Sequence, residues 1–120
     1  MRRLLLLLIA PMLLACGGDK FPAVDTELAL AKLAAGAAVI DVRTAKERES
    51  GVLPNAIPIL HTEIVAGVTD LGVSKDQSLV LYCRSGRRSG IAVAALREAG
   101  YTEVTNGGGY AELHEAIQRQ

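Results

Sequence analysis

The sequence predicts a single α/β domain built on a small, mostly parallel sheet that is flanked by helices. Strand-like and helix-like patterns alternate from residue 25 to the end of the sequence. Two largely apolar runs, at residues 37–42 and 78–82, are typical of strands that are buried on both faces of a parallel sheet. The chain has 120 residues and no internal repeat, which limits it to one domain with one modest core.

The first half of this domain is expected to hold a helix, a central strand and an edge strand. Asp25 or Thr26 can cap a helix that Gly36 ends. The central strand is the apolar run at 37–42. A short strand at 56–59 contains a proline, which cannot donate a ladder hydrogen bond and therefore predicts a position at the edge of the sheet.

Between these strands, Thr44 and Glu47 have the spacing of a capping box, which predicts a short helix that ends near Ser50. Residues 62–71 give an ambiguous pattern that fits one or two helical turns. The second half of the domain follows the same alternation. Its expected elements are a strand at 78–82, a helix at 90–99 that Ser89 can cap, a strand at 101–105, a glycine-rich turn at 106–109 and a helix at 111–119.

The N-terminus predicts an exported protein. Two arginines precede an apolar run at 4–15, which is shorter than the roughly 20 residues that span a bilayer and has the form of a signal peptide. The run ends in Leu-Leu-Ala-Cys, which resembles a bacterial lipobox in which Cys16 is lipidated. The expected organisation is a lipoprotein signal peptide at 1–15, a tether at 16–24 and the domain at 25–120. The alternative is an ordinary cleaved signal whose cysteine lies near the cut by chance.

A lipid anchor on Cys16 would attach the protein to the cell membrane or the outer membrane, facing the periplasm or the exterior. The charge of the chain makes a nucleic-acid partner unexpected. The whole sequence is neutral, and loss of the signal peptide would leave 11 basic against 13 acidic residues. Three of these positive charges, Arg84, Arg87 and Arg88, lie in one short segment, which suits a small anionic substrate better than a long polyanion.

The candidate nucleophile is Cys83, at the predicted carboxyl end of the strand at 78–82, where open α/β sheets bind their ligands. A loop rich in arginine, serine and glycine follows it and leads into a helix. The backbone N–H groups of such a loop and the positive end of the helix dipole favour an anion, and they lower the pKa of a thiol. The chain has two cysteines. If Cys16 carries lipid, Cys83 has no partner for a structural disulfide.

Four segments resemble the signatures of the rhodanese-type sulfurtransferases, and the resemblance covers about residues 25–120. The segment around the cysteine is similar to the active-site loop of that family. The matching segments, in the family's order, are residues 40–44 (Ile-Asp-Val-Arg-Thr), 51–57 (Gly-Val-Leu-Pro-Asn-Ala-Ile), 82–89 (Tyr-Cys-Arg-Ser-Gly-Arg-Arg-Ser) and 106–109 (Asn-Gly-Gly-Gly). The resemblance implies a rhodanese-like three-layer fold and thiosulfate sulfurtransferase activity.

The resemblance also implies a mechanism. The Cys83 thiolate takes the outer sulfur of thiosulfate or a similar anionic donor, becomes a persulfide, and passes that sulfur to cyanide or to a thiol. Arg88 and Arg84 are expected to contact the donor in preference to Arg87. No cofactor and no metal is expected, because His61 and His114 have no metal-ligand spacing and read as surface residues. The expected substrate-binding residues are Arg84, Ser85, Gly86, Arg87, Arg88 and Ser89.

Three other functions are compatible with parts of this sequence. A cysteine phosphatase or arsenate reductase needs an arginine six positions after the cysteine, and Ser89 stands there. The loop is therefore shorter, and it fits a sulfur atom better than a tetrahedral oxyanion. A persulfide carrier that serves a partner protein would have the same residues and stays open. A thiol redox protein is less favoured because the chain has no Cys-x-x-Cys pair.

Some residues in the matching segments are expected to have structural roles. Asp41 and Arg43 are expected to tie the end of a strand to neighbouring segments. The glycines of the turn at 106–109 are expected to let the last helix approach the sheet. Val52 and Leu113 depart from the family, in which these positions often hold histidine and tryptophan, and the chain has no tryptophan.

Overall fold

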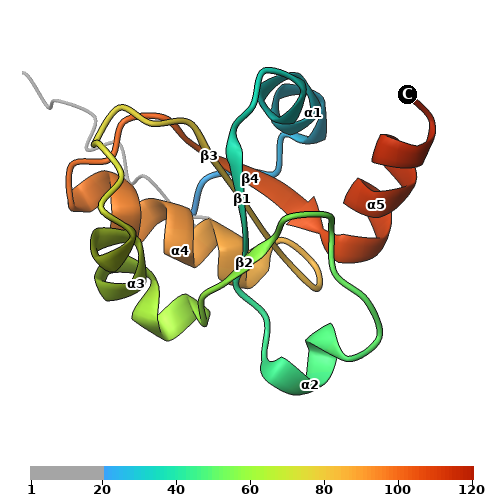
Figure 1. The fold of residues 1–120 in the computed structure, drawn as a ribbon, viewed down its shortest axis with the longest axis horizontal. Coiled ribbons are helices and arrows are strands. Elements are labelled where there is room, and N and C mark those ends of the chain that lie inside the picture. Colours follow the sequence, from blue (N-terminus) through green and yellow to red (C-terminus); the bar gives the residue numbers. More distant parts are fainter. Residues whose placement is uncertain (1–20) are drawn as a thin grey trace, which may run out of the picture.

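Four parallel strands form the middle layer of the protein, whose computed structural model describes residues 21–120 (Figure 1). The strand order is β2-β1-β3-β4, and every neighbouring pair is parallel. The strands are β1 (Ala38–Asp41), β2 (Ile57–Pro58), β3 (Leu79–Cys83) and β4 (Val104–Gly109). The predicted α/β class with a small parallel sheet is confirmed. The proposed signal peptide and Cys16 lie outside the described residues.

Helices cover both faces of the sheet. Figure 1 shows α3 and α4 on one side of the strands and α1 and α5 on the other, with α2 beyond the ends of the central strands. The helical elements are α1 (Thr26–Ala34), α2 (Ala45–Arg48), the 3-10 turn η1 (His61–Glu63), α3 (Ile64–Leu71), α4 (Arg87–Glu98) and α5 (Tyr110–Gln118). The three layers match the rhodanese-like architecture that the sequence predicts.

The local sequence signals at the start of the domain are confirmed. The Asp25 side chain accepts a hydrogen bond from the backbone N–H of Leu28 at 3.0 Å and so caps α1. The Thr44 hydroxyl and the Glu47 carboxylate form the predicted capping box of α2. The strand that contains Pro58 lies at the edge of the sheet, where its missing N–H leaves no gap in a ladder.

Helix α4 begins earlier than the sequence predicts. Gly86, not Ser89, is its N-cap, in a left-handed conformation with φ of 93°, and the helix starts at Arg87. Ser89 therefore lies inside the first turn, and the expectation that it caps this helix is wrong. Its hydroxyl hydrogen-bonds to the Asn106 side chain instead. A glycine can adopt the left-handed geometry without cost, so it replaces a side-chain cap at this position.

The glycine-rich segment at 106–109 is strand, not the predicted turn. Strand β4 starts at Val104, later than the expected residue 101, and continues through Gly109. Its register with β3 shifts between Leu81 and Tyr82, and the positive φ of Gly108, 95°, accompanies this irregularity. The close approach of the last helix is confirmed, because a Cβ atom on Gly107 would lie 3.1 Å from the Leu113 side chain.

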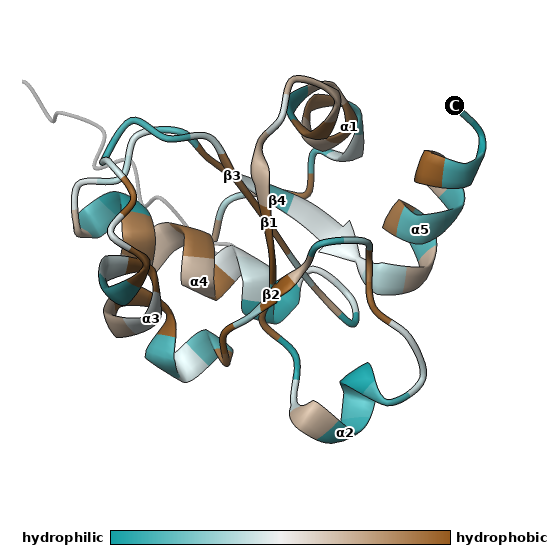
Figure 2. Ribbon diagram, in the orientation of Figure 1, coloured by the Kyte–Doolittle hydropathy of each residue, from teal (hydrophilic) through white to brown (hydrophobic). Residues whose placement is uncertain are grey.

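Alternate residues of β3 enter the two hydrophobic cores. Leu79, Leu81 and Cys83 face α3 and α4, whereas Val80 and Tyr82 face α1 and α5. All five side chains are fully buried, as expected for a central strand between two helical layers. In Figure 2, β1 and β3 are coloured as hydrophobic in the middle of the molecule, and hydrophilic residues lie mainly on the outer helices and loops. Among residues 21–120, no helix is long and apolar enough to cross a membrane.

Candidate functional site

Cys83 is the last residue of β3, and its sulfur lies under the loop that leads into α4. The side chain has no exposed surface. The backbone N–H of Gly86 donates a hydrogen bond to Sγ at 2.9 Å, and the Ser89 hydroxyl lies 3.4 Å from Sγ. The structure thus brings together three of the predicted site residues, Cys83, Gly86 and Ser89, around one sulfur atom.

Two opposing effects act on the pKa of the Cys83 thiol. Burial raises it, because a thiolate is poorly solvated inside the protein. Hydrogen bonds from the Ser89 hydroxyl and from the backbone N–H groups of Ser89, Ser85 and Gly86 lower it. The hydrogen bonds outweigh burial, so the pKa of this thiol lies below its ordinary value. A buried cysteine that is nevertheless acidic is prepared to act as a nucleophile.

Close packing fixes the shape of the loop. A Cβ atom on Gly86 would lie 2.6 Å from the Val24 side chain and 3.4 Å from the Cα atom of Gly108. With its left-handed φ, Gly86 is therefore a position that only glycine can occupy without displacing its neighbours. The turn at Gly86 directs the free N–H groups at the start of α4 toward the sulfur.

The three arginines of the loop have different surroundings. Arg88 forms a two-pronged ion pair with Glu47 of α2, with nitrogen–oxygen distances of 2.7 and 2.6 Å. Arg84 and Arg87 are exposed and form no salt bridge within residues 21–120. The pairing with Arg88, together with hydrogen bonds from Thr44, lowers the pKa of the Glu47 carboxyl to about 2. Glu47 therefore stays ionised and holds Arg88 in one place.

An open pocket of about 320 Å³ lies beside the loop. Arg84, the residue after the cysteine, is one of its walls, and Tyr110 at the start of α5 is another. The complete lining is Arg43, Glu47, Ser50, Arg84, Tyr110 and Ala111. Sequence reasoning placed Glu47 only in a capping box and gave Ser50, Tyr110 and Ala111 no part in the site. Their approach to the loop depends on how α2 and α5 pack at the end of the sheet, which no local pattern encodes.

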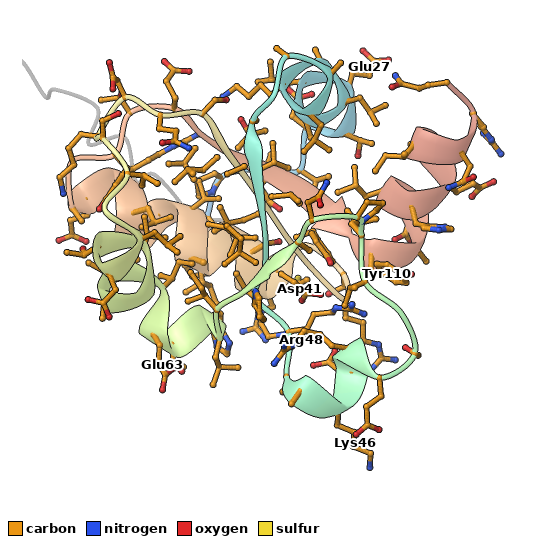
Figure 3. All side chains as sticks on the ribbon, viewed as in Figure 1. Glu27, Asp41, Lys46, Arg48, Glu63 and Tyr110 are labelled. Atoms are coloured by element: carbon orange, nitrogen blue, oxygen red, sulfur yellow. The ribbon has the colours of Figure 1, made fainter. Side chains whose placement is uncertain are left out.

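The predicted structural role of Asp41 and Arg43 is confirmed. The Arg43 guanidinium bonds to the Asp41 carboxylate at 2.8 Å and to the backbone carbonyl of Gly51 at 2.7 Å. The same carboxylate accepts a hydrogen bond from the Tyr82 hydroxyl at 2.7 Å. Arg43 also stacks on the ring of Tyr110, 4.4 Å from its centroid. Figure 3 shows Asp41 and Tyr110 near each other at this end of the molecule, while Lys46 points to solvent.

The remaining predicted residues contribute little to this site. His61 and His114 are half-buried rather than fully on the surface, and the His114 ring lies 5.5 Å from the ring of Tyr110. Within residues 21–120 no three metal-binding side chains come together. Val52 is exposed, whereas Leu113 is buried in the core between β4 and α5. Cys16 lies outside the described residues.

A second cavity, of about 380 Å³, contains none of the predicted site residues. It lies among α1, β1 and α5, and its walls are mostly apolar side chains such as Leu30, Leu33 and Ile117. It holds no acidic, basic or thiol side chain that could carry a reaction. This cavity is therefore not a candidate for the reactive site.

Comparisons with known proteins point to one family. The model of the rhodanese-like domain matches residues 25–116. A protein named "Sulfurtransferase" from Allochromatium vinosum is 37% identical over 68 residues, which are 57% of this chain and 62% of that protein. Thiosulfate sulfurtransferase PspE from Escherichia coli (strain K12) is 34% identical over 74 residues, which are 62% of this chain and 71% of that protein.

The fold of the chain is also found among solved structures. A structure described as a rhodanese with anions from E. coli has a TM-score of 0.61 and 32% sequence identity, and the match covers 64% of this chain and 91% of that one. The chain thus spans less than two thirds of the length of the first curated relative but most of this solved structure.

Proposed function

This chain belongs to the rhodanese-like domain family, and from that membership we propose that it is a thiosulfate sulfurtransferase that works through a persulfide on Cys83. Sulfurtransferase activity in the general sense is supported by the two relatives that carry that name. One observation favours the persulfide route most. The Cys83 sulfur lies among the N–H groups of its own loop, where a negatively charged sulfur is stabilised.

In the first step the Cys83 thiolate attacks the outer sulfur of thiosulfate. A new sulfur–sulfur bond forms at Cys83, the sulfur–sulfur bond of thiosulfate breaks, and sulfite leaves with the electron pair. In the second step cyanide or a thiolate attacks the outer sulfur of the persulfide. The products are thiocyanate or a new persulfide, and the Cys83 thiolate is released with its electron pair.

The loop after Cys83 stabilises negative charge on sulfur in both steps. The backbone N–H groups of Ser85, Gly86 and Ser89 hold the negative charge while it resides on sulfur. Arg84 and Arg87 are exposed and free to draw in an anionic donor, and Arg84 borders the pocket beside the loop. Arg88 is held by Glu47, so its role is to maintain a fixed positive charge near the sulfur.

Mass spectrometry of the protein after incubation with thiosulfate tests this proposal. We expect one additional sulfur, about 32 Da, on Cys83, and its removal by cyanide with formation of thiocyanate. The variant Cys83→Ser is the control and should take up no sulfur. Absence of the adduct, together with turnover of p-nitrophenyl phosphate, would overturn the proposal in favour of a phosphatase. Sulfur uptake without thiocyanate formation would indicate a carrier that needs a partner protein.

We also propose that the protein is exported and anchored by lipid at Cys16, facing the periplasm or the exterior. The support for this is the sequence alone, with two arginines, an apolar run of twelve residues and a lipobox-like ending. A domain that starts at residue 25 is compatible with such an anchor, because the family match begins at that residue.

A further inference from the structure

Asn106 of β4 is buried beside the Cys83 loop, with 2% of its surface exposed. Its side-chain nitrogen donates hydrogen bonds to the carbonyl oxygens of Gly86 and Pro22, at 2.9 and 3.0 Å. Its side-chain oxygen accepts hydrogen bonds from the Ser89 hydroxyl at 2.7 Å and from the backbone N–H of Gly108 at 3.1 Å. Every hydrogen-bonding position of the amide is therefore used.

These partners allow only one orientation of the amide. The Gly86 and Pro22 carbonyls can only accept hydrogen bonds, and the Gly108 N–H can only donate one. Exchanging the nitrogen and the oxygen would place like against like at three contacts. A buried amide with four such contacts is rigid, and leaving any of them unsatisfied would cost free energy.

Asn106 holds the Cys83 loop at two points. Gly86, whose carbonyl it binds, donates its own N–H to the Cys83 sulfur. Asn106 also binds the Ser89 hydroxyl, and this hydroxyl lies within hydrogen-bonding distance of the Cys83 sulfur. The backbone N–H groups of Ser85, Gly86 and Ser89 form a cradle around the sulfur. A change at Asn106 therefore affects both sides of this N–H cradle, although Asn106 does not itself touch the sulfur.

The same residue connects the loop to the N-terminal segment Phe21–Asp25. In addition to the bond to Pro22, the backbone carbonyl of Asn106 accepts a hydrogen bond from the N–H of Asp25 at 2.9 Å. The Val24 side chain packs closely against Gly86 and Gly108. Residues 21–24 have no helix or strand, as expected of a tether, but they support the back of the loop.

We propose that Asn106 is a positioning residue for the reaction at Cys83, because it fixes the Gly86 carbonyl and the Ser89 hydroxyl so that the loop N–H groups converge on the sulfur. The chemistry in which it assists rests on the proposed function. The reactivity of the Cys83 thiol does not depend on the proposed function, because an alkylating reagent measures this reactivity without any sulfur donor. The two proposals can therefore fail separately.

The charged groups around Cys83 come from other elements than β4. They are Arg84 of the loop, Arg87 and Arg88 of α4, Glu47 of α2, and the pair of Asp41 and Arg43 at the end of β1. None of them hydrogen-bonds to Asn106 within the described residues. A substitution at Asn106 therefore alters the hydrogen bonds at the sulfur and leaves the neighbouring charges in place.

The test compares the variant Asn106→Ala with the unaltered protein. We expect the rate of Cys83 alkylation by iodoacetamide, followed against pH, to report a thiol pKa that is higher by about one unit, since the N–H groups lose their fixed direction. In the thiosulfate and cyanide assay we expect kcat to fall about tenfold, with KM for thiosulfate little changed because Asn106 does not reach the donor. If the unaltered protein lacks sulfurtransferase activity, the alkylation profile still tests the role of Asn106.

A matched control separates positioning from general destabilisation. Val68→Ala removes buried methyl groups from α3, a helix that supplies no residue of the loop, and should lower Tm while leaving the thiol pKa and kcat unchanged. If Asn106→Ala merely lowers Tm in the same way, the proposal is wrong. A lower thiol pKa in Asn106→Ala would also overturn it, because Asn106 would then act only by competing for the Ser89 hydrogen.

A measurement on the unaltered fold keeps the proposal testable if Asn106→Ala does not fold. The side-chain NH₂ signals of Asn106 in a nitrogen–proton NMR spectrum should shift with pH, with the same midpoint as Cys83 alkylation. The shift should be absent in Cys83→Ser. If the Asn106 signals do not shift as Cys83 ionises, Asn106 is not coupled to the sulfur and the proposal is wrong.

Discussion

At the scale of single residues, the main feature of the molecule is a thiol that is fully buried and nevertheless acidic. Burial alone would leave Cys83 protonated and inert, as it does for most cysteines inside proteins. The hydrogen bonds of one short loop reverse that outcome. The sequence allowed the loop and its preference for an anion to be predicted, because the type and order of its residues carry that information. Asn106 escaped prediction because its partners outside β4 come from two distant segments, the N-terminal segment and the loop after Cys83.

The acidity of Cys83 depends in part on the Ser89 hydroxyl, so we predict that Ser89→Ala raises the pKa of the thiol. The hydroxyl hydrogen can turn from Asn106 to the sulfur when the sulfur is ionised, and alanine removes this donor. At a pH near 7 the variant should therefore contain less thiolate and react more slowly with iodoacetamide. The ultraviolet absorbance of the thiolate, recorded against pH, gives the titration midpoint of Cys83 in Ser89→Ala and in the unaltered protein. An unchanged midpoint would assign the low pKa to the backbone N–H groups alone.

The ion pair of Glu47 and Arg88 should be visible in the pH dependence of stability. The folded protein holds the pKa of Glu47 at about 2, below its unfolded value of 4.5, so the pair stabilises the fold above pH 4.5 and loses its effect as pH falls through 2. We predict that Glu47→Gln lowers the free energy of unfolding by ~1 kcal/mol at pH 7, a modest amount because both side chains are partly exposed.

The difference between Glu47→Gln and the unaltered protein should shrink steadily as pH is lowered from 4.5 toward 2. Urea unfolding followed at several pH values measures it. A difference that stays constant over this range would mean that the charge of Glu47 does not matter and that only its capping hydrogen bonds do.

At the scale of elements, local signals predicted boundaries well where the deciding contacts are local. The Asp25 cap of α1 and the capping box of α2 each involve residues within four positions of one another. The start of α4 and the length of β4 depend on distant contacts instead. Val24 and Gly108 pack so closely against Gly86 that no side chain fits there. The glycines of β4 extend the sheet because they pair with β3 through an irregular register. A sequence window cannot contain both sides of such contacts.

The end of β4 gives a prediction at this scale. A Cβ atom on Gly109 would lie 2.6 Å from the backbone carbonyl oxygen of Arg84, which cannot move without shifting the loop after Cys83. We predict that Gly109→Ala lowers the rate of sulfur transfer at least about tenfold because the N–H cradle is displaced. The rate of persulfide formation, measured by mass spectrometry at short times, checks this expectation.

Gly67→Ala is the matched control for that variant. There the new Cβ atom would lie 2.5 Å from the Cγ2 methyl group of Ile59, so the contact is with a side chain and not with the backbone of the loop after Cys83. Gly67 lies in α3, so alanine also favours the helix. This variant should keep its sulfur-transfer rate. Equal losses in both variants would show that Gly109 matters for stability and not for the shape of the loop.

At the scale of the whole molecule, the parallel sheet explains why separated segments form one site. The carboxyl ends of β1, β3 and β4 lie side by side. Asp41 with its partner Arg43, Cys83 and the last glycines of β4 therefore meet at the same end of the sheet. The fold class could be predicted because apolar runs and their alternation with helices encode it directly. The walls of the pocket could not, because they depend on where α2 and α5 come to rest on that edge.

The whole protein also includes the N-terminal residues that carry the proposed anchor, and the prediction there concerns location rather than chemistry. Cys16→Ser should abolish lipid attachment and move the protein from the membrane fraction to the soluble fraction. Its kcat should stay unchanged, because the Cys83 site is built from residues of the domain that starts at residue 25 and from the segment next to it. Cys83→Ser should behave in the opposite way, remaining in the membrane fraction without activity. If Cys16→Ser still sediments with membranes, attachment has another cause, and the lipid anchor is wrong.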